Sequence, residues 1–222
     1  MGGMIPLSDA SRQTAAPAIA TGTIIVLNFV VFLLELAGGD TFVMRWAVIP
    51  ADITGGHHWI TILTAMFMHA GWLHIIGNMI FLRAFGPEIE ESMGSIRFLC
   101  FYLLCGIVAF VAQLLMMPTS KVPNLGASGA IAGVMGAFLI TYPHDRIKTL
   151  VFFGWLYRTT FIPAALLIGL WFVVQLFSQV GAVASADSGG GVAYAAHVGG
   201  FLFGAVMARV FEHPRTASAW DD

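Results

Sequence analysis

Charged residues are scarce in this chain of 222 residues. They make up 10% of it, whereas soluble domains carry about 25%. Hydrophobic residues make up 58%, and the mean hydropathy is +0.85. A soluble core of this length has no room for so many apolar side chains. We therefore expect an all-α, polytopic membrane protein.

Other scarce features each exclude a class of protein or site. The net charge of −2 shows no excess of basic residues, so we expect no nucleic-acid partner. The two cysteines, Cys100 and Cys105, are five residues apart on an expected helix and point to different faces, which excludes an ordinary disulfide. The first 17 residues are polar, carry Arg12 as their one basic residue, and lack the apolar run of a cleaved signal peptide.

Six apolar segments are expected to be membrane-spanning helices, over residues 18–37, 68–86, 96–117, 128–142, 160–179 and 194–211. They form one transmembrane domain, 18–211, between a polar segment, 1–17, and a short tail, 212–222. A bilayer core of about 30 Å needs about 20 helical residues, so the fourth segment is short. Its first residue, Ser128, is then expected below the membrane surface, in a depression open to water.

The distribution of lysine and arginine predicts the orientation. An even number of spans puts both termini on one side. That side would hold eight of the ten basic residues, all except Arg45 and Lys121. Because positive charge favours the cytoplasm, we expect both termini to be cytoplasmic and Ser128 to lie near the outer face. The acidic block Glu88, Glu90 and Glu91 is then expected to be a solvated cytoplasmic surface.

A serine and a histidine mark the fourth and sixth segments. Ser128 begins one of them and His197 lies near the start of the other. Polar groups at membrane depth are rare and usually functional. Small residues recur every four positions on both helices: Ser128, Ala132 and Gly136 on one, and Ala196, Gly200 and Gly204 on the other. Such stripes let helices approach closely, so we expect them to dock and bring Ser128 within reach of His197.

The second segment carries further polar groups. His74 and Asn78 are four residues apart and share a helix face, and His69 precedes them at the expected mouth of the helix. An imidazole and an amide aimed into one cavity can donate hydrogen bonds to a developing oxyanion. His69, His74 and His197 are also three possible zinc ligands. With no carboxylate or cysteine beside them and no H-E-x-x-H spacing, we expect neither a metal nor a cofactor.

A third catalytic member is not apparent among the acids. The acids on the expected outer side are Glu35, Asp40, Asp52 and Asp187, and nothing in the sequence brings any of them to His197. A serine with one histidine suffices for acyl transfer. The sequence therefore favours a Ser–His dyad.

These residues resemble those of the rhomboid intramembrane serine proteases, over about residues 42–210. The shared motifs are His69, His74 and Asn78; Gly126-Ala127-Ser128-Gly129; Ala196-His197 with Gly200 and Gly204; and Phe85-Gly86-Pro87-Glu88-Ile89-Glu90. The resemblance implies a six-helix rhomboid bundle with Ser128 as the nucleophile and His197 as the base. It also implies an oxyanion hole made by His74, Asn78 and the Ser128 backbone amide.

Two positions depart from the family pattern. Arg45-Trp46 has the reverse order of the Trp-Arg pair that many relatives carry in the first loop. Ala132 replaces the aromatic residue that stacks on the catalytic histidine in many relatives. Another group must then orient His197, and Phe201, Tyr194 and a water molecule are the candidates.

The resemblance implies a protease of a bacterial inner membrane. It would cleave single-span membrane proteins near the outer face of the bilayer, after a small residue, and without a cofactor. The alternative is a catalytically silent relative that binds membrane clients. Such a relative is expected to lose the serine or the histidine, and this chain keeps both. A small transporter would predict repeated halves with broken helices, and the sequence shows no internal repeat.

Overall fold

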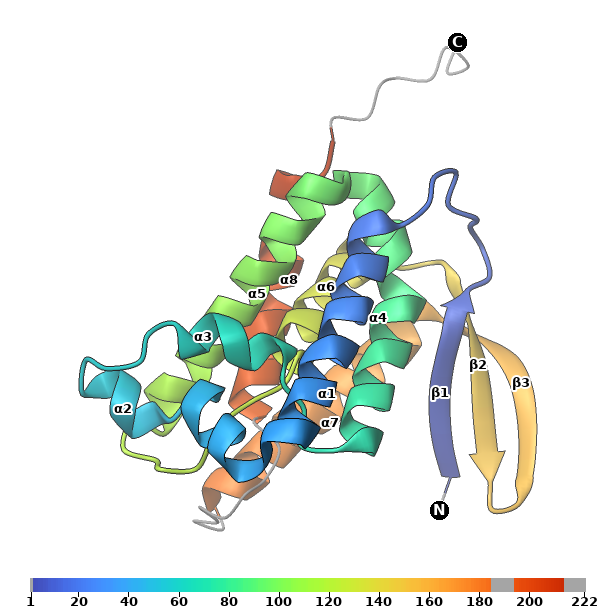
Figure 1. The fold of residues 1–222 in the computed structure, drawn as a ribbon. Helices are drawn as coiled ribbons and strands as arrows, with labels where there is room; N and C mark the ends of the chain where they lie inside the picture. Colours follow the sequence, from blue (N-terminus) through green and yellow to red (C-terminus); the bar gives the residue numbers. More distant parts are fainter. Residues whose placement is uncertain (1, 185–193, 214–222) are drawn as a thin grey trace.

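The computed structural model describes residues 2–184 and 194–213 of the chain (Figure 1). The longer helices are α1 (Ile19–Trp46), α4 (Trp72–Met93), α5 (Ser95–Met116), α6 (Ser128–Thr141), α7 (Ala164–Ala184) and α8 (Tyr194–Phe211). Short helices occupy the connection between α1 and α4: α2 (Pro50–Thr54), α3 (Thr61–Thr64) and the 3-10 helix η1 (Ala65–Phe67). Consecutive long helices alternate in direction, so α4, α6 and α8 all begin at one end of the bundle, here called the Ser128 end (Figure 1).

Most helix boundaries lie close to the predicted ones. The structure has helices at Ser95–Met116, Ser128–Thr141 and Tyr194–Phe211, where the sequence predicts 96–117, 128–142 and 194–211. The first helix continues beyond the predicted end at residue 37, after a break at Gly39. The φ of Gly39 is 57° and its ψ is −152°, which a helix interior does not accommodate. The expected span and its continuation to Trp46 are therefore two helical pieces.

The predicted count of six spans is not confirmed by helix length. Among the described residues, α1, α5 and α8 are long and apolar enough to cross a bilayer, and the bent unit of Thr61–Phe67 and Trp72–Met93 makes a fourth. Two further apolar helices are shorter over the residues whose side chains the structure describes: Ser128–Thr141, and Ala164–Phe177 within α7. At 1.5 Å per residue, the 14 residues of α6 extend about 21 Å, less than a bilayer core.

The fold is mostly helical rather than all-α, because the chain also forms a three-stranded antiparallel sheet in the order β1-β2-β3. Its strands are β1 (Gly2–Asp9), β2 (Arg146–Phe153) and β3 (Leu156–Pro163). Figure 1 shows the sheet beside α4. In β2, Ile147 and Thr149 are buried whereas Arg146 and Lys148 are exposed, which is the two-residue period of a half-buried strand. The predicted fifth span, 160–179, started too early for this reason: residues 160–163 belong to β3.

Helix α6 lies at the centre of the bundle. Every residue from Gly129 to Phe138 is buried, as expected for a helix that is apolar on all sides. Its neighbours include α4, α5 and α8. The rest of the chain therefore fixes the position of Ser128, at the start of α6, from several sides.

In the acidic block at the end of α4, Glu91 is exposed as predicted, but Glu88 and Glu90 are not part of a solvated surface. Glu90 is 3% exposed, and its carboxylate accepts hydrogen bonds from the backbone N–H groups of Ala20 (2.8 Å) and Thr21 (2.7 Å). The hydroxyl of Ser95 donates a third, at 2.6 Å. The first N–H groups of a helix have no partner within it, so Glu90 caps α1 from a distance in sequence. Glu88 is also buried, at 7% exposure.

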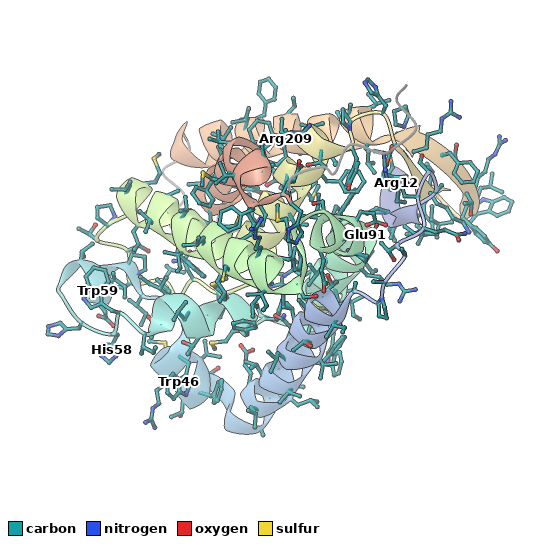
Figure 2. All side chains as sticks on the ribbon, turned by 90° about the horizontal axis from the view of Figure 1, so that it is seen from above. Arg12, Trp46, His58, Trp59, Glu91 and Arg209 are labelled. Carbon is teal, nitrogen blue, oxygen red and sulfur yellow. The ribbon has the colours of Figure 1, made fainter. Side chains whose placement is uncertain are left out.

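The polar N-terminal segment is tied to the bundle. Residues 2–9 of the predicted segment 1–17 form β1, and the Arg12 guanidinium pairs with Asp145 and lies 4.2 Å from the centre of the Tyr142 ring. Figure 2 shows His58 and Trp59 on the segment that projects from the side of the bundle, far from Arg12. Most of the predicted tail 212–222, most of the loop 180–193, and Asp187 lie outside the described residues.

Candidate active site

A glycine shapes the approach to Ser128. Gly126 has a φ of 136°, which side chains other than hydrogen rarely permit, and its N–H donates to the Ala65 carbonyl at 2.9 Å. A Cβ at this position would lie 3.0 Å from Cε1 of His74. Glycine therefore lets the His74 ring come close to the start of α6.

Helices α6 and α8 pack with backbone against backbone. A Cβ built at Gly200 would overlap the Gly129 carbonyl, and one at Gly204 would overlap the Gly133 carbonyl. The predicted stripe on α8 is therefore correct. The predicted stripe on α6 is correct at Gly136 and wrong at Ser128 and Ala132, because Gly129 and Gly133 pack against α8 in their place. Ser128 and Ala132 line a cavity instead, because one residue is about 100° of rotation on a helix.

Ser128 and His197 come together although 69 residues separate them in the sequence. The Oγ of Ser128 is 2.7 Å from the Nε2 of His197, within hydrogen-bonding distance. His197 is 8% exposed, and the cavity beside the pair has a volume of about 210 Å³. A serine hydroxyl that donates to an imidazole can lose its proton as it attacks a carbonyl carbon.

The second ring nitrogen of His197 also has a partner, which the sequence reading missed. Gln175, on α7, places its Oε1 2.8 Å from His197 Nδ1. The missed signal was a glutamine within an apolar segment, since polar residues there usually have a role. Gln175 is an amide and not a carboxylate, so it lies outside the set of acids from which a third catalytic member was expected.

Rings from two helices surround His197. The Trp171 ring on α7 lies 5.9 Å from the His197 ring at an interplanar angle of 38°, and Tyr194 lies 6.5 Å away at 87°. Of the two aromatic candidates from the sequence, Tyr194 contacts the histidine and Phe201 stacks on Phe172 at 4.2 Å. Trp171 was not predicted. It lines the cavity together with Ala132, the position where many relatives carry the aromatic residue.

His74 and Asn78 line the same cavity as Ser128 and His197. The Nδ1 of His74 accepts a hydrogen bond from the Ala70 N–H at 3.3 Å, so its Nε2 carries the proton and is a donor. Within the described part of the chain, Nδ2 of Asn78 is buried without a hydrogen-bond partner. Buried polar groups usually have partners, so this donor is available to a bound group.

His69 lies behind His74 and does not line this cavity. It is 1% exposed, and its ring centre is 5.1 Å from that of His74. Its backbone N–H donates to Oε2 of Glu35 at 2.9 Å, which ties this turn to α1. The three histidines do not converge: residues 2–184 and 194–213 contain no group of three or more His, Cys, Asp or Glu arranged to hold a metal ion.

An apolar helical bundle with buried polar groups inside it defines a multi-pass membrane protein. The sequence matches the Rhomboid domain over residues 56–213, well over half of the chain. The chain therefore belongs to the rhomboid family, as its motifs predicted.

Similar proteins come from bacteria and from organelles. The chain is 30% identical to Rhomboid protease GluP of Bacillus subtilis over 190 residues, which is 84% of this chain and 33% of that protein. It is 32% identical to chloroplastic Rhomboid-like protein 11 of Arabidopsis thaliana over 157 residues, 67% of this chain and 51% of that protein. It is 28% identical to mitochondrial Rhomboid protein 1 of Saccharomyces cerevisiae over 183 residues, 80% of this chain and 49% of that protein. The chain thus spans one third to one half of the length of these relatives.

Proposed function

We propose that this chain is an intramembrane serine endopeptidase that cleaves membrane-anchored proteins. The observation that carries the proposal is the hydrogen bond of 2.7 Å between Ser128 Oγ and His197 Nε2 beside a cavity between helices. Membership of a family that includes a protein named as a protease supports it. We expect the substrates to be membrane proteins, because a site within an apolar helical bundle is most accessible to protein chains that are themselves in the bilayer.

The reaction starts at Ser128. Its Oγ attacks the carbonyl carbon of the scissile peptide bond, and Nε2 of His197 takes the hydroxyl proton. The C–N bond then breaks, the imidazolium gives the proton to the leaving amine, and an acyl-enzyme remains. A water molecule that enters through the cavity gives a proton to His197 as its oxygen attacks the ester carbon. The C–Oγ bond then breaks, the new carboxyl product leaves, and the imidazolium returns the proton to Ser128 Oγ.

The oxyanion that forms in each step needs donors. Nε2–H of His74 and Nδ2 of Asn78 are suited to this role because both residues line the cavity and both groups are donors. The backbone N–H of Ser128 adds a third, since the first N–H groups of α6 have no partner within the helix. The positive end of the α6 dipole favours the same negative charge.

In this proposal the protein lies in a bacterial inner membrane with both termini in the cytoplasm. Ser128 then lies near the outer face of the membrane. The bias of basic residues toward the expected cytoplasmic side supports this orientation. A C-terminal fusion to alkaline phosphatase, which is active only outside the cytoplasm, should then be inactive. An active fusion would reverse the orientation.

A fluorophosphonate probe tests the function directly. The purified protein in detergent should be labelled at Ser128, and it should cleave a single-span test substrate. Ser128→Ala and His197→Ala should each abolish cleavage while the protein stays folded. Ser92→Ala is the matched control, because the hydroxyl of Ser92 donates only to the nearby Ile89 carbonyl. Cleavage by Ser128→Ala at the normal rate refutes the proposal, and client binding without labelling favours the catalytically silent alternative.

A further inference from the structure

The glutamine beside His197 has no role in the reaction described so far. Gln175 is on α7, whereas Ser128 is on α6 and His197 on α8. Its Oε1 lies 2.8 Å from Nδ1 of His197, and the other ring nitrogen lies 2.7 Å from Ser128 Oγ. Both nitrogens of the imidazole are therefore engaged, in a continuous chain of hydrogen bonds from Gln175 to Ser128.

The oxygen of Gln175 determines which nitrogen of His197 carries the proton. With Oε1 facing the ring, as in this structure, Nδ1 is the protonated nitrogen, because a carbonyl oxygen only accepts hydrogen bonds. Nε2 then presents its lone pair to the serine hydroxyl, as a general base requires. The opposite tautomer would need the Gln175 amide turned over so that its NH2 donates to Nδ1, and it would present an N–H to the serine. In a histidine site, the partner of one ring nitrogen commonly selects the tautomer in this way.

We propose that Gln175 is a positioning residue that holds His197 in the tautomer and orientation needed to accept the Ser128 proton. This inference rests on the proposed protease function. In Ser–His–Asp enzymes a buried aspartate fills this place, and in papain-like enzymes an asparagine does. A neutral amide orients the ring without the desolvation cost of a buried carboxylate.

The surroundings of His197 leave this task to α7. Ala132 offers no ring to stack on, and Glu35 is engaged with the backbone of His69. Trp171 lies one helical turn before Gln175, with its ring 5.9 Å from His197. Helix α7 thus supplies both the hydrogen-bond acceptor and a neighbouring ring, so the geometry of the base depends on how α7 packs against α8.

Three substitutions at this position separate positioning from simple packing. Gln175→Leu has nearly the same size and no acceptor. We expect kcat to fall on the order of a hundredfold, the loss typical of a misplaced catalytic group, and KM to stay within about threefold. Gln175→Asn keeps the amide on a shorter stem and should be intermediate. Gln175→Glu should retain more activity than Gln175→Leu, and the acid limb of its pH–rate profile should move to higher pH, because a carboxylate favours the protonated imidazole.

The matched control is Gln113→Leu. Gln113 is also a buried glutamine in an apolar helix, at 8% exposure, and its Nε2 lies 3.6 Å from the sulfur of Met117. This change should leave kcat within about twofold. A wild-type kcat in Gln175→Leu would overturn the inference while the protease function stands. An equal loss in both leucine variants, in step with lower thermal midpoints, would also overturn it.

The tautomer of His197 can also be measured directly, without any assay of cleavage. Nitrogen-15 NMR of protein labelled at histidine, with His197 assigned from the signal that is missing in His197→Ala, reports which ring nitrogen is protonated. We expect the proton on Nδ1 in the wild type and a mixture of tautomers in Gln175→Leu. A proton on Nε2 in the wild type would overturn the inference, whereas absent cleavage and absent probe labelling would instead refute the proposed function.

Discussion

A single methyl group at Gly200 should disturb both the fold and the site. In Gly200→Ala, the new Cβ overlaps the Gly129 carbonyl oxygen and lies 3.0 Å from its carbon and 3.3 Å from Cβ of Ala109. Backbone atoms cannot rotate away, so α8 must shift relative to α6. Overpacking of this kind costs about 1–3 kcal/mol, and backbone contact favours the upper end. Alanine returns about 1 kcal/mol of helix propensity, which leaves a net loss of about 2 kcal/mol.

This loss corresponds to a fall of about 4–8 °C in the thermal midpoint for a chain of this size. The rate of reaction at Ser128 should also fall, because the shift of α8 moves the two catalytic side chains apart. Gly129 follows Ser128, and Gly200 lies one turn after His197, so the same shift lengthens the Oγ–Nε2 distance of 2.7 Å. A misplacement of about 1 Å costs on the order of a hundredfold in rate. Thermal unfolding in detergent and the rate of fluorophosphonate labelling measure the two effects.

The control for Gly200→Ala is Gly169→Ala on α7, where a Cβ would meet no atom within 4 Å. Its thermal midpoint should stay the same or rise slightly, because alanine favours the helix. If Gly200→Ala behaves like Gly169→Ala in both assays, the close packing of α6 on α8 and its importance for the site are refuted.

Four other substitutions test three separate parts of the structure. His74→Ala and Asn78→Ala should each lower kcat on the order of a hundredfold, about 3 kcal/mol, and leave probe labelling detectable; unchanged rates would remove both from the oxyanion hole. Ala132→Phe places a ring in the cavity of about 210 Å³. We expect an unchanged thermal midpoint and at least a tenfold loss of kcat/KM for a transmembrane substrate, because the ring occupies space that the substrate needs. A lower midpoint would show that the cavity cannot take the ring. The pKa of Asp9 is raised by burial and by the nearby Asp145 carboxyl, so its ionisation should weaken the attachment of β1 as the pH rises above the ordinary aspartate pKa of about 3.9. Hydrogen exchange of the β1 amides should therefore show less pH dependence in Asp9→Asn, and equal pH dependence in both proteins would contradict the assignment.

Much of the helical structure could be predicted because the bilayer simplifies the pattern. Long apolar stretches become helices, and the bounds of α5, α6 and α8 follow from where those stretches end. The sheet could not be predicted in this way. Strand β3 continues directly into the apolar helix α7, which hides its hairpin with β2, and β1, which begins at residue 2, pairs with β2, which begins at residue 146. Strand pairing over such a separation leaves no local signal.

The site was predictable as a set of residue types but not as a geometry. Motif spacing pointed to Ser128, His197, His74 and Asn78, and all four line one cavity. Ser128 and Ala132 were wrongly assigned to the face of α6 that packs on α8, because Gly129 and Gly133 beside them have the same spacing. Gln175 stood apart from any motif, so its contact with His197 emerged only from the packing of α7.

The sequence by itself determined that this is a mostly helical membrane protein of the rhomboid family, and it indicated the side chains that we propose carry its chemistry. Composition and motif spacing are local properties, and the chain holds them before it folds. Only the tertiary structure decided that Glu90 caps α1, that Ser128 and Ala132 face a cavity, and that Gln175 holds Nδ1 of His197. Each of these contacts depends on how the helices are rotated and how closely they approach one another. The packing of the whole bundle sets both, and no single segment of the sequence does.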